Sequence, residues 1–86
     1  MAESPEHRLK RLKMRSMRRG IKEMDIIFAR YTDAHLAKMT ADELDLFEAL
    51  LAENDQDLYQ WVSGQASPPA RFDALITRIS EEIGAV

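Results

Sequence analysis

The sequence predicts an all-α fold, a compact bundle of five short helices. Three observations predict it. Apolar residues recur at helical spacing along most of the chain, no segment alternates apolar and polar residues over the length of a strand, and turn pairs such as Asn-Gly are absent. A chain of 86 residues is long enough for one small core. We therefore expect residues 1–86 to form a single helical domain, in which residues 1–7 are a flexible N-terminus.

The first helix is predicted from Pro5 to about Arg18, and it has a thin apolar face. Its few apolar residues are Leu9, Leu12, Met14 and Met17. Four arginines recur at i, i+3, i+7 and i+10, namely Arg8, Arg11, Arg15 and Arg18. On a continuous helix they would form one cationic stripe. Such a stripe is typical of a solvated face. A docking surface is the alternative, which the thin apolar face favours.

Two more strongly amphipathic helices follow. The second spans about residues 20–37, and its apolar stripe contains Ile21, Met24, Phe28 and Tyr31. After a break at residues 38–40, the run T-A-D-E predicts a capping box for the third helix, with Thr40 at the N-cap and Glu43 at N3. The buried face of this helix is expected to contain Leu44, Phe47, Leu50 and Leu51.

The last two helices are also short. Asn54 or Asp55 can cap the fourth helix, which ends at Ser63–Gly64. Its apolar residues are Leu58, Trp61 and Val62. The loop G-Q-A-S-P-P-A then leads to the fifth helix, which the pair Pro68–Pro69 is expected to open. That helix carries an apolar stripe of Phe72, Leu75, Ile76, Ile79 and Ile83.

The sequence lacks the patterns that mark an enzyme. The absence of cysteine excludes thiolate chemistry. The two histidines, His7 and His35, do not lie in a metal-ligand spacing, and there is no G-x-S-x-G, Walker or G-x-G-x-x-G stretch. We expect no catalytic residue, no metal and no cofactor of the protein's own. Because the apolar runs are too short to cross a bilayer, no direct membrane insertion is expected either.

The charge of the chain is unevenly distributed. Residues 1–22 hold eight basic and two acidic side chains, a net +6, whereas residues 23–86 hold four basic and thirteen acidic side chains, a net −9. This split indicates a positive surface at one end of an acidic domain, able to attract an acidic partner. The acidic remainder would repel phosphates, and the basic segment has no interleaved aromatic residues for base stacking. We therefore expect no nucleic acid as a partner.

The stretch R-S-M-R-R-G-I-K-E-M-D, residues 15–25, has two interpretations of equal weight on physical grounds. In the first, Gly20 makes a turn between two helices, by adopting φ > 0 or as an N-cap with Glu23 at N3. In the second, the glycine lets the backbone of another protein come close, while Arg19 and Glu23 make charge-assisted hydrogen bonds to it. From the residues alone, both remain open.

Within this stretch, R-G-x-x-E resembles the signature of the flavinylation factors of succinate dehydrogenase, which are the SdhE-type proteins of bacteria and succinate dehydrogenase assembly factor 2 of mitochondria. A second run, L-x-x-F-E-x-L-L-x-x-x-D-x-D-L-x-x-W at Leu44–Trp61, is also similar to this family. The resemblance covers most of the chain. Asp57 and Trp61 match the second run and are expected to be mainly structural.

The resemblance implies a small five-helix assembly factor that is not an enzyme. Members bind the flavoprotein subunit of succinate dehydrogenase, and in bacteria that of fumarate reductase, and promote covalent attachment of FAD to a histidine of that subunit. FAD is then the cofactor of the client, and the factor acts by positioning and is monomeric when free. The residues carried over to the client-facing surface are Arg19, Gly20 and Glu23 at its centre, Arg18 and Asp25 beside them, and Arg15, Arg11 and Arg8 at its rim.

Two further expectations concern the compartment of the protein and an alternative function. Mitochondrial members carry an N-terminal extension that this sequence lacks, so a bacterial, cytoplasmic protein is expected. The alternative function is a helical adaptor or nucleic-acid-associated module that uses the basic first helix.

Overall fold

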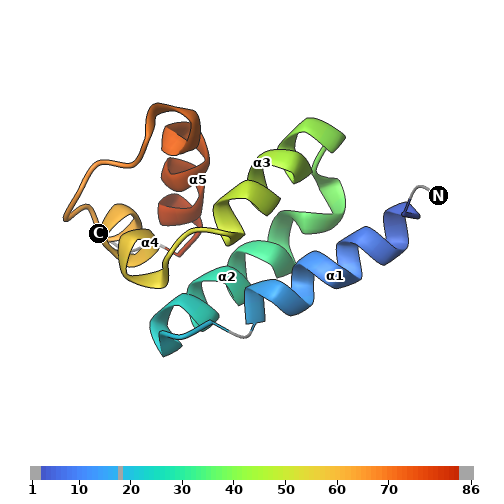
Figure 1. Cartoon of the computed structure of the whole chain (residues 1–86), viewed down its shortest axis with the longest axis horizontal. Helices are drawn as coiled ribbons and strands as arrows, with labels where there is room; N and C mark the ends of the chain where they lie inside the picture. Colours follow the sequence, from blue (N-terminus) through green and yellow to red (C-terminus); the bar gives the residue numbers. More distant parts are fainter. Residues whose placement is uncertain (1–2, 18, 84–86) are drawn as a thin grey trace.

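Five α-helices follow one another in the computed structural model, which describes residues 3–17 and 19–83 (Figure 1). The helices are α1 (Pro5–Met17), α2 (Lys22–His35), α3 (Ala41–Leu51), α4 (Asp55–Val62) and α5 (Asp73–Ile83). Two short 3-10 turns, η1 (Leu36–Lys38) and η2 (Ala70–Phe72), precede α3 and α5. No strand occurs among the described residues, and the predicted all-α class with five short helices is confirmed.

The helix α2 is central to the packing. It contacts α1, α4 and α5, and α1 also contacts α3. Figure 1 shows α1 and α2 side by side, with α4 and α5 at the opposite end of the molecule from the N-terminus. Phe28 of α2 meets Phe47 of α3 edge to face, with ring centroids 5.8 Å apart, a geometry worth about 1 kcal/mol beyond area burial. Fully buried apolar side chains come from all five helices and η2: Leu12, Met24, Phe28, Phe47, Leu50, Leu58, Phe72 and Ile79.

Several helix boundaries follow the predicted signals. The capping box forms, because Thr40 Oγ1 accepts the Glu43 N–H at 3.2 Å and Glu43 Oε1 accepts the Thr40 N–H at 2.8 Å. Of the two candidate caps for α4, the structure uses Asn54, whose Oδ1 accepts the Gln56 N–H at 2.7 Å. This choice leaves the carboxylate of Asp55 available for another contact.

Two helix starts differ from the prediction. The N-cap of α2 is Ile21, with no side-chain hydrogen bond, so Gly20 does not cap this helix. The pair Pro68–Pro69 does not open α5; Pro69 lies outside the helix with ψ 148°, and η2 intervenes before Asp73. A residue that precedes a proline is disfavoured in the α region, which explains why the helix starts after the pair.

The N-terminal segment is partly helical. Residues 5–7, which belong to the segment expected to be flexible, form the first turn of α1. The Oγ of Ser4 accepts the His7 N–H at 3.2 Å, as an N-cap residue does. No helix within the described part of the chain is long and apolar enough to span a bilayer.

Candidate docking surface

The turn between α1 and α2 is fixed to the connection between α3 and α4 by one arginine. The Arg19 guanidinium donates to Asp55 Oδ1 at 2.6 Å, to the Leu51 carbonyl at 2.7 Å and to the Glu53 carbonyl at 2.9 Å. The side chains of Arg19 and Asp55 are only 11% and 15% exposed. The final carbonyls of a helix have no partner within it and attract positive charge. Arg19 therefore satisfies the end of α3 and pairs with the start of α4 at the same time.

Gly20 continues the same contact through its backbone. Its N–H donates to Asp55 Oδ2, and the Arg19 N–H donates to Asp25 Oδ1 at 2.6 Å. We call the Arg19 guanidinium, the Gly20 N–H and the Asp55 carboxylate the clasp. A Cβ added at Gly20 would lie 3.1 Å from Asp55 Oδ2. The glycine is needed here for close approach to a carboxylate, not for a left-handed φ, because Gly64 is the glycine with positive φ among the described residues.

The residues predicted to form the centre of the client-facing surface, and those predicted to lie beside it, thus separate into two groups. Arg19 and Asp25 use their polar groups inside the protein, and both are partly buried. Gly20 and Glu23 are exposed, and the Glu23 side chain has no hydrogen bond or ion pair to any described residue. Arg18 lies outside the described residues. The signature therefore contains one fixed guanidinium and one free carboxylate.

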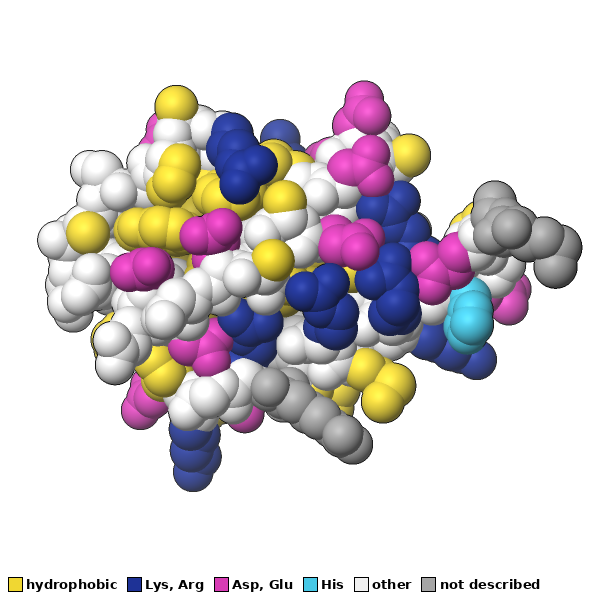
Figure 2. Space-filling model, in the orientation of Figure 1, with side chains coloured by type: hydrophobic (Ala, Val, Ile, Leu, Met, Phe, Trp, Pro, Cys, Tyr) yellow, Lys and Arg dark blue, Asp and Glu magenta, His cyan; other side chains and the backbone are white. Residues whose placement is uncertain are grey.

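The predicted cationic stripe packs on the acidic side of α3. Arg8 pairs with Asp45 at 2.6 Å and with Glu48 at 3.3 Å, and Arg11 pairs with Glu48 at 2.9 Å. Arg15 lies 3.8 Å from Glu48. Figure 2 shows Lys and Arg side chains alternating with Asp and Glu side chains over this part of the molecule. The stripe contributes to the α1–α3 contact and is largely neutralised there, whereas its role at the rim of a client interface stays a prediction.

These ion pairs lower the pKa of the carboxyl groups that take part in them. The hydrogen bond from Arg11 is the main cause that lowers the pKa of Glu48, and the nearby Arg8 acts in the same direction. Arg11 also lowers the pKa of Glu3, to which it donates at 2.9 Å. Glu48 and Glu3 are therefore ionised at neutral pH, and the ionised Glu48 supports the α1–α3 contact.

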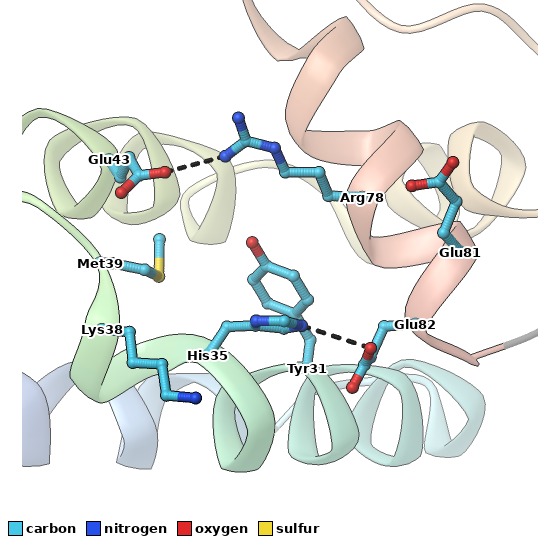
Figure 3. A pocket seen from close by; sticks show the side chains of 8 residues that line it. All are labelled: Tyr31, His35, Lys38, Met39, Glu43, Arg78, Glu81 and Glu82. Atoms are coloured by element: carbon cyan, nitrogen blue, oxygen red, sulfur yellow. Dashed lines mark hydrogen bonds and ion pairs between the residues drawn. The ribbon is translucent and has the colours of Figure 1, made fainter.

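A separate pocket of about 410 Å³ lies between α2, η1 and α5 (Figure 3). Ion pairs flank it, with Arg78 donating to Glu43 at 2.8 Å and His35 Nε2 lying 3.3 Å from Glu82. Burial raises the pKa of Tyr31, so its phenol stays protonated at neutral pH. Among the side chains that line the pocket, none pairs a nucleophile with a general base, and no cluster suited to a metal ion occurs in the described residues.

Sequence reasoning missed Asp55 as a partner of the signature. The sequence did contain a signal for this contact. The run E-N-D offers two residues that can cap α4, Asn54 and Asp55, and a helix needs only one of them. Asp57, two residues on, is exposed, and Trp61 is half-buried with its ring centroid 6.1 Å from that of Phe72. The second sequence block thus supplies core contacts through Trp61, and its neighbour Asp55 supplies the contact to the turn.

Residues 10–83 match the family described as flavinator of succinate dehydrogenase. Three similar curated proteins are each named succinate dehydrogenase assembly factor 2, mitochondrial. The protein of Penicillium rubens is 35% identical over 79 residues, which cover 87% of this chain and 26% of the relative. That of Candida glabrata is 43% identical over 61 residues, 71% of this chain and 40% of the relative. That of Lodderomyces elongisporus is 42% identical over 53 residues, 62% of this chain and 32% of the relative. The chain therefore spans well under half the length of these relatives.

The comparison corrects one expectation. A bacterial, cytoplasmic protein is expected from the sequence, but the relatives are named as mitochondrial proteins of eukaryotes. That expectation is wrong. It depended on a missing N-terminal extension, and the point at which a sequence starts carries no physical information about the compartment.

The first prediction concerns the clasp. Asp55→Ala removes the acceptor of both the Arg19 guanidinium and the Gly20 N–H and leaves a largely buried cation without its partner. We predict that the free energy of unfolding, measured by urea denaturation, falls by about 3 kcal/mol. Asp57→Ala is the matched control, since Asp57 occupies the same helical turn but is exposed; it should cost less than about 1 kcal/mol. Equal losses in the two variants would contradict the clasp.

The second prediction concerns the α1–α3 ion pairs. The pKa of Glu48 lies below its usual value of 4.5 in the folded protein. Its contribution to stability is therefore present above the unfolded pKa and is lost as the pH falls through the folded pKa. We predict that the free energy of unfolding decreases as the pH is lowered from about 5 to about 3, and that Glu48→Gln makes this decrease shallower.

Urea denaturation at a series of pH values measures this effect. Glu81→Gln serves as the control, because Glu81 is exposed and makes no ion pair with a described residue. A pH dependence that is identical in the wild-type protein and in Glu48→Gln would show that the α1–α3 pairs do not form in solution.

Proposed function

Because the chain belongs to the succinate dehydrogenase flavinator family, we propose that it binds the flavoprotein subunit of succinate dehydrogenase and promotes covalent attachment of FAD to that subunit. The FAD is the cofactor of the client, and the flavin supplies the electrophilic chemistry. This chain contributes binding and positioning. The flavoprotein subunit of fumarate reductase is a second client under the same proposal.

The observation that supports the site best is the contrast between Arg19 and Glu23. The Arg19 side chain is 11% exposed and donates to three internal acceptors. Glu23, four residues later, is exposed and unpaired among the described residues. A free carboxylate beside a turn that is already fixed loses little conformational freedom when it binds. We assign Glu23 to the contact with the client and Arg19 to the positioning of the turn.

Gly20 serves both purposes in this proposal. Its N–H is bound to Asp55, but the residue is exposed on its other side. Because glycine has no side chain, the backbone of the client can approach the turn closely next to Glu23. A larger residue at position 20 would obstruct the client from outside and press on Asp55 from inside.

Catalysis by positioning fits the chemistry of the described side chains. The side chains that line the pocket beside Tyr31 do not pair a nucleophile with a general base, and under this proposal the reacting groups come from the client and its flavin. Holding two reactants in a productive geometry lowers a barrier by up to about 7–11 kcal/mol without any reactive side chain on the holding protein. An assembly factor of this kind needs a rigid docking surface more than it needs an active site.

The alternative, a nucleic-acid-associated module, is less well supported. As expected from the sequence, this alternative would use the cationic stripe of the basic first helix for its phosphate contacts. Arg8 and Arg11 are already paired with Asp45 and Glu48, and those carboxylates would repel a phosphate backbone.

The third prediction tests the proposed function. In cells that lack their own factor, co-expression of this chain with the flavoprotein subunit should raise covalent flavin, seen as in-gel fluorescence of the denatured subunit. Glu23→Gln removes the negative charge but keeps the shape of the side chain. We predict that it lowers the gain at least tenfold, as expected for the loss of about 1.4 kcal/mol of interface free energy, and leaves the free energy of unfolding unchanged.

Glu6→Gln is the control, because Glu6 is also an exposed glutamate in the first turn of a helix. It should retain the full gain in covalent flavin. No gain with the wild-type chain would overturn the proposed function, and a full gain with Glu23→Gln would overturn only the role of Glu23.

A further inference from the structure

Three large apolar side chains are exposed, and all of them flank the signature turn. Met14 is 57% exposed, Met17 is 52% exposed and Ile26 is 54% exposed. Together they are the exposed large apolar residues of the described chain, and they all fall within six positions of Gly20. Figure 2 shows hydrophobic side chains at the lower edge of the molecule, next to α1. Exposed apolar residues that gather in one region mark an interaction site more often than scattered ones do.

The packing of α1 on α2 brings the residues that precede the signature turn next to those that follow it. Lys13 donates to Thr32 Oγ1 at 2.6 Å and to Asp33 Oδ1 at 2.5 Å, so it lies opposite the second half of α2. The two helices are joined by a short turn and run in opposite directions (Figure 1). Met17 is one helical turn further along α1 and therefore lies opposite residues 28 and 29 of α2, and Ile26 is about one turn closer to the signature turn on α2.

An apolar depression lies on the same pair of helices, further from the signature turn. It has a volume of about 490 Å³ and is lined mainly by apolar atoms from α1, α2 and η1. Leu9 and Met14 form one wall, and Leu36 and Ala37 form the other. Met17, about one helical turn beyond Met14 on α1, and Ile26 on α2 continue the exposed apolar residues from this depression toward the signature turn.

Unpaired cations border this surface. Lys10, Lys22 and Arg30 are exposed, and none lies within ion-pair distance of a carboxylate in the described residues. Lys13 and Asp33, which both line the depression, form an ion pair and neutralise each other's charge. Two exposed carboxylates without an ion pair to a described residue, Glu6 and Glu23, lie near these three cations, so the surface has a net charge of about +1, in contrast to the net −3 of the whole chain.

We propose that the outer hairpin surface, made of Met14, Met17, Ile26, Lys10, Lys22 and Arg30, binds an acidic amphipathic segment of the client flavoprotein. Apolar side chains of that segment contact Met17 and Ile26 and enter the depression at Met14. Carboxylates that flank those side chains pair with Lys10, Lys22 and Arg30. The identity of the partner rests on the proposed function, whereas the position and chemistry of the surface rest on exposure and charge.

This surface differs from the one that the cationic stripe predicts. Arg8, Arg11 and Arg15 point to α3, where carboxylates of the same chain already bind them. The cations on the outer hairpin surface are free to attract a partner. Apolar anchors surrounded by complementary charge are typical of an interface in which a few side chains supply most of the affinity and the charges speed association.

The experiment measures binding of the purified flavoprotein subunit, free of covalent FAD, to the full chain and its variants. Met17→Asp and Ile26→Asp place a charge at an apolar anchor and next to acidic groups of the partner. Each should raise the Kd at least tenfold. Lys22→Glu should slow association and make it less sensitive to salt. Ala74→Asp, at an exposed position of α5, is the matched control and should bind like the wild-type chain.

A second measurement identifies the occupant. A photo-crosslinking amino acid at position 17 should attach to a client peptide that combines apolar residues with Asp or Glu, as read by mass spectrometry. Crosslinking to a second copy of this chain while the client is saturating would overturn the proposal. So would unchanged affinity in both Met17→Asp and Ile26→Asp. If the wild-type chain does not bind the subunit at all, the proposed function fails first, and the assignment of this partner fails with it.

Discussion

The rest of the structure depends on the contact between Arg19 and Asp55. It joins the turn after α1 to the connection between α3 and α4, two segments that lie more than thirty positions apart in the chain. One guanidinium satisfies the carbonyls of Leu51 and Glu53 and pairs with a carboxylate, and the same carboxylate accepts the N–H of Gly20. The desolvation of both charges is offset because the guanidinium makes three hydrogen bonds and the carboxylate accepts two. Apart from this contact, α1 and its turn are attached to the bundle by packing on α2, by the contacts of Lys13 with Thr32 and Asp33, and by ion pairs to α3.

The clasp gives the arginine and the glutamate of the signature R-G-x-x-E different roles. On the sequence, the arginine and the glutamate look equivalent, as two charges on either side of a glycine. In the structure they have opposite environments: Arg19 is enclosed, and Glu23 is exposed. The sequence alone did not decide whether residues 15–25 form a turn or a docking site. The two interpretations are therefore compatible. A rigid turn presents a free carboxylate, and the neighbouring Met17 and Ile26 add apolar area to the same side of the hairpin.

Local features could be predicted well, and contacts between distant charges could not. Helical periodicity and the T-A-D-E capping box depend on residues within one or two turns, so the helices and the Thr40 cap follow from the sequence. The start of α5 was missed because the disfavoured α conformation before Pro69 competes with the tolerance of a first turn for proline. Arg8 and Arg11 form ion pairs with Glu48, which lies nearly forty positions away in the chain. No rule based on sequence spacing predicts such a pair. The exposure of Met14, Met17 and Ile26 is likewise a result of packing, because the helical pattern alone does not say which apolar residues remain uncovered.

The central claim is that Gly20 is bound to Asp55 in solution, so that an exposed turn is nevertheless fixed. Amide hydrogen exchange followed by NMR tests it most directly. The account predicts that the Gly20 amide exchanges much more slowly than the amides of Lys22 and Glu23, which lie in the first turn of α2 and have no helical acceptor. It also predicts that Asp55→Ala removes this protection. A Gly20 amide that exchanges as fast as that of Lys22 in the wild-type protein would contradict the account.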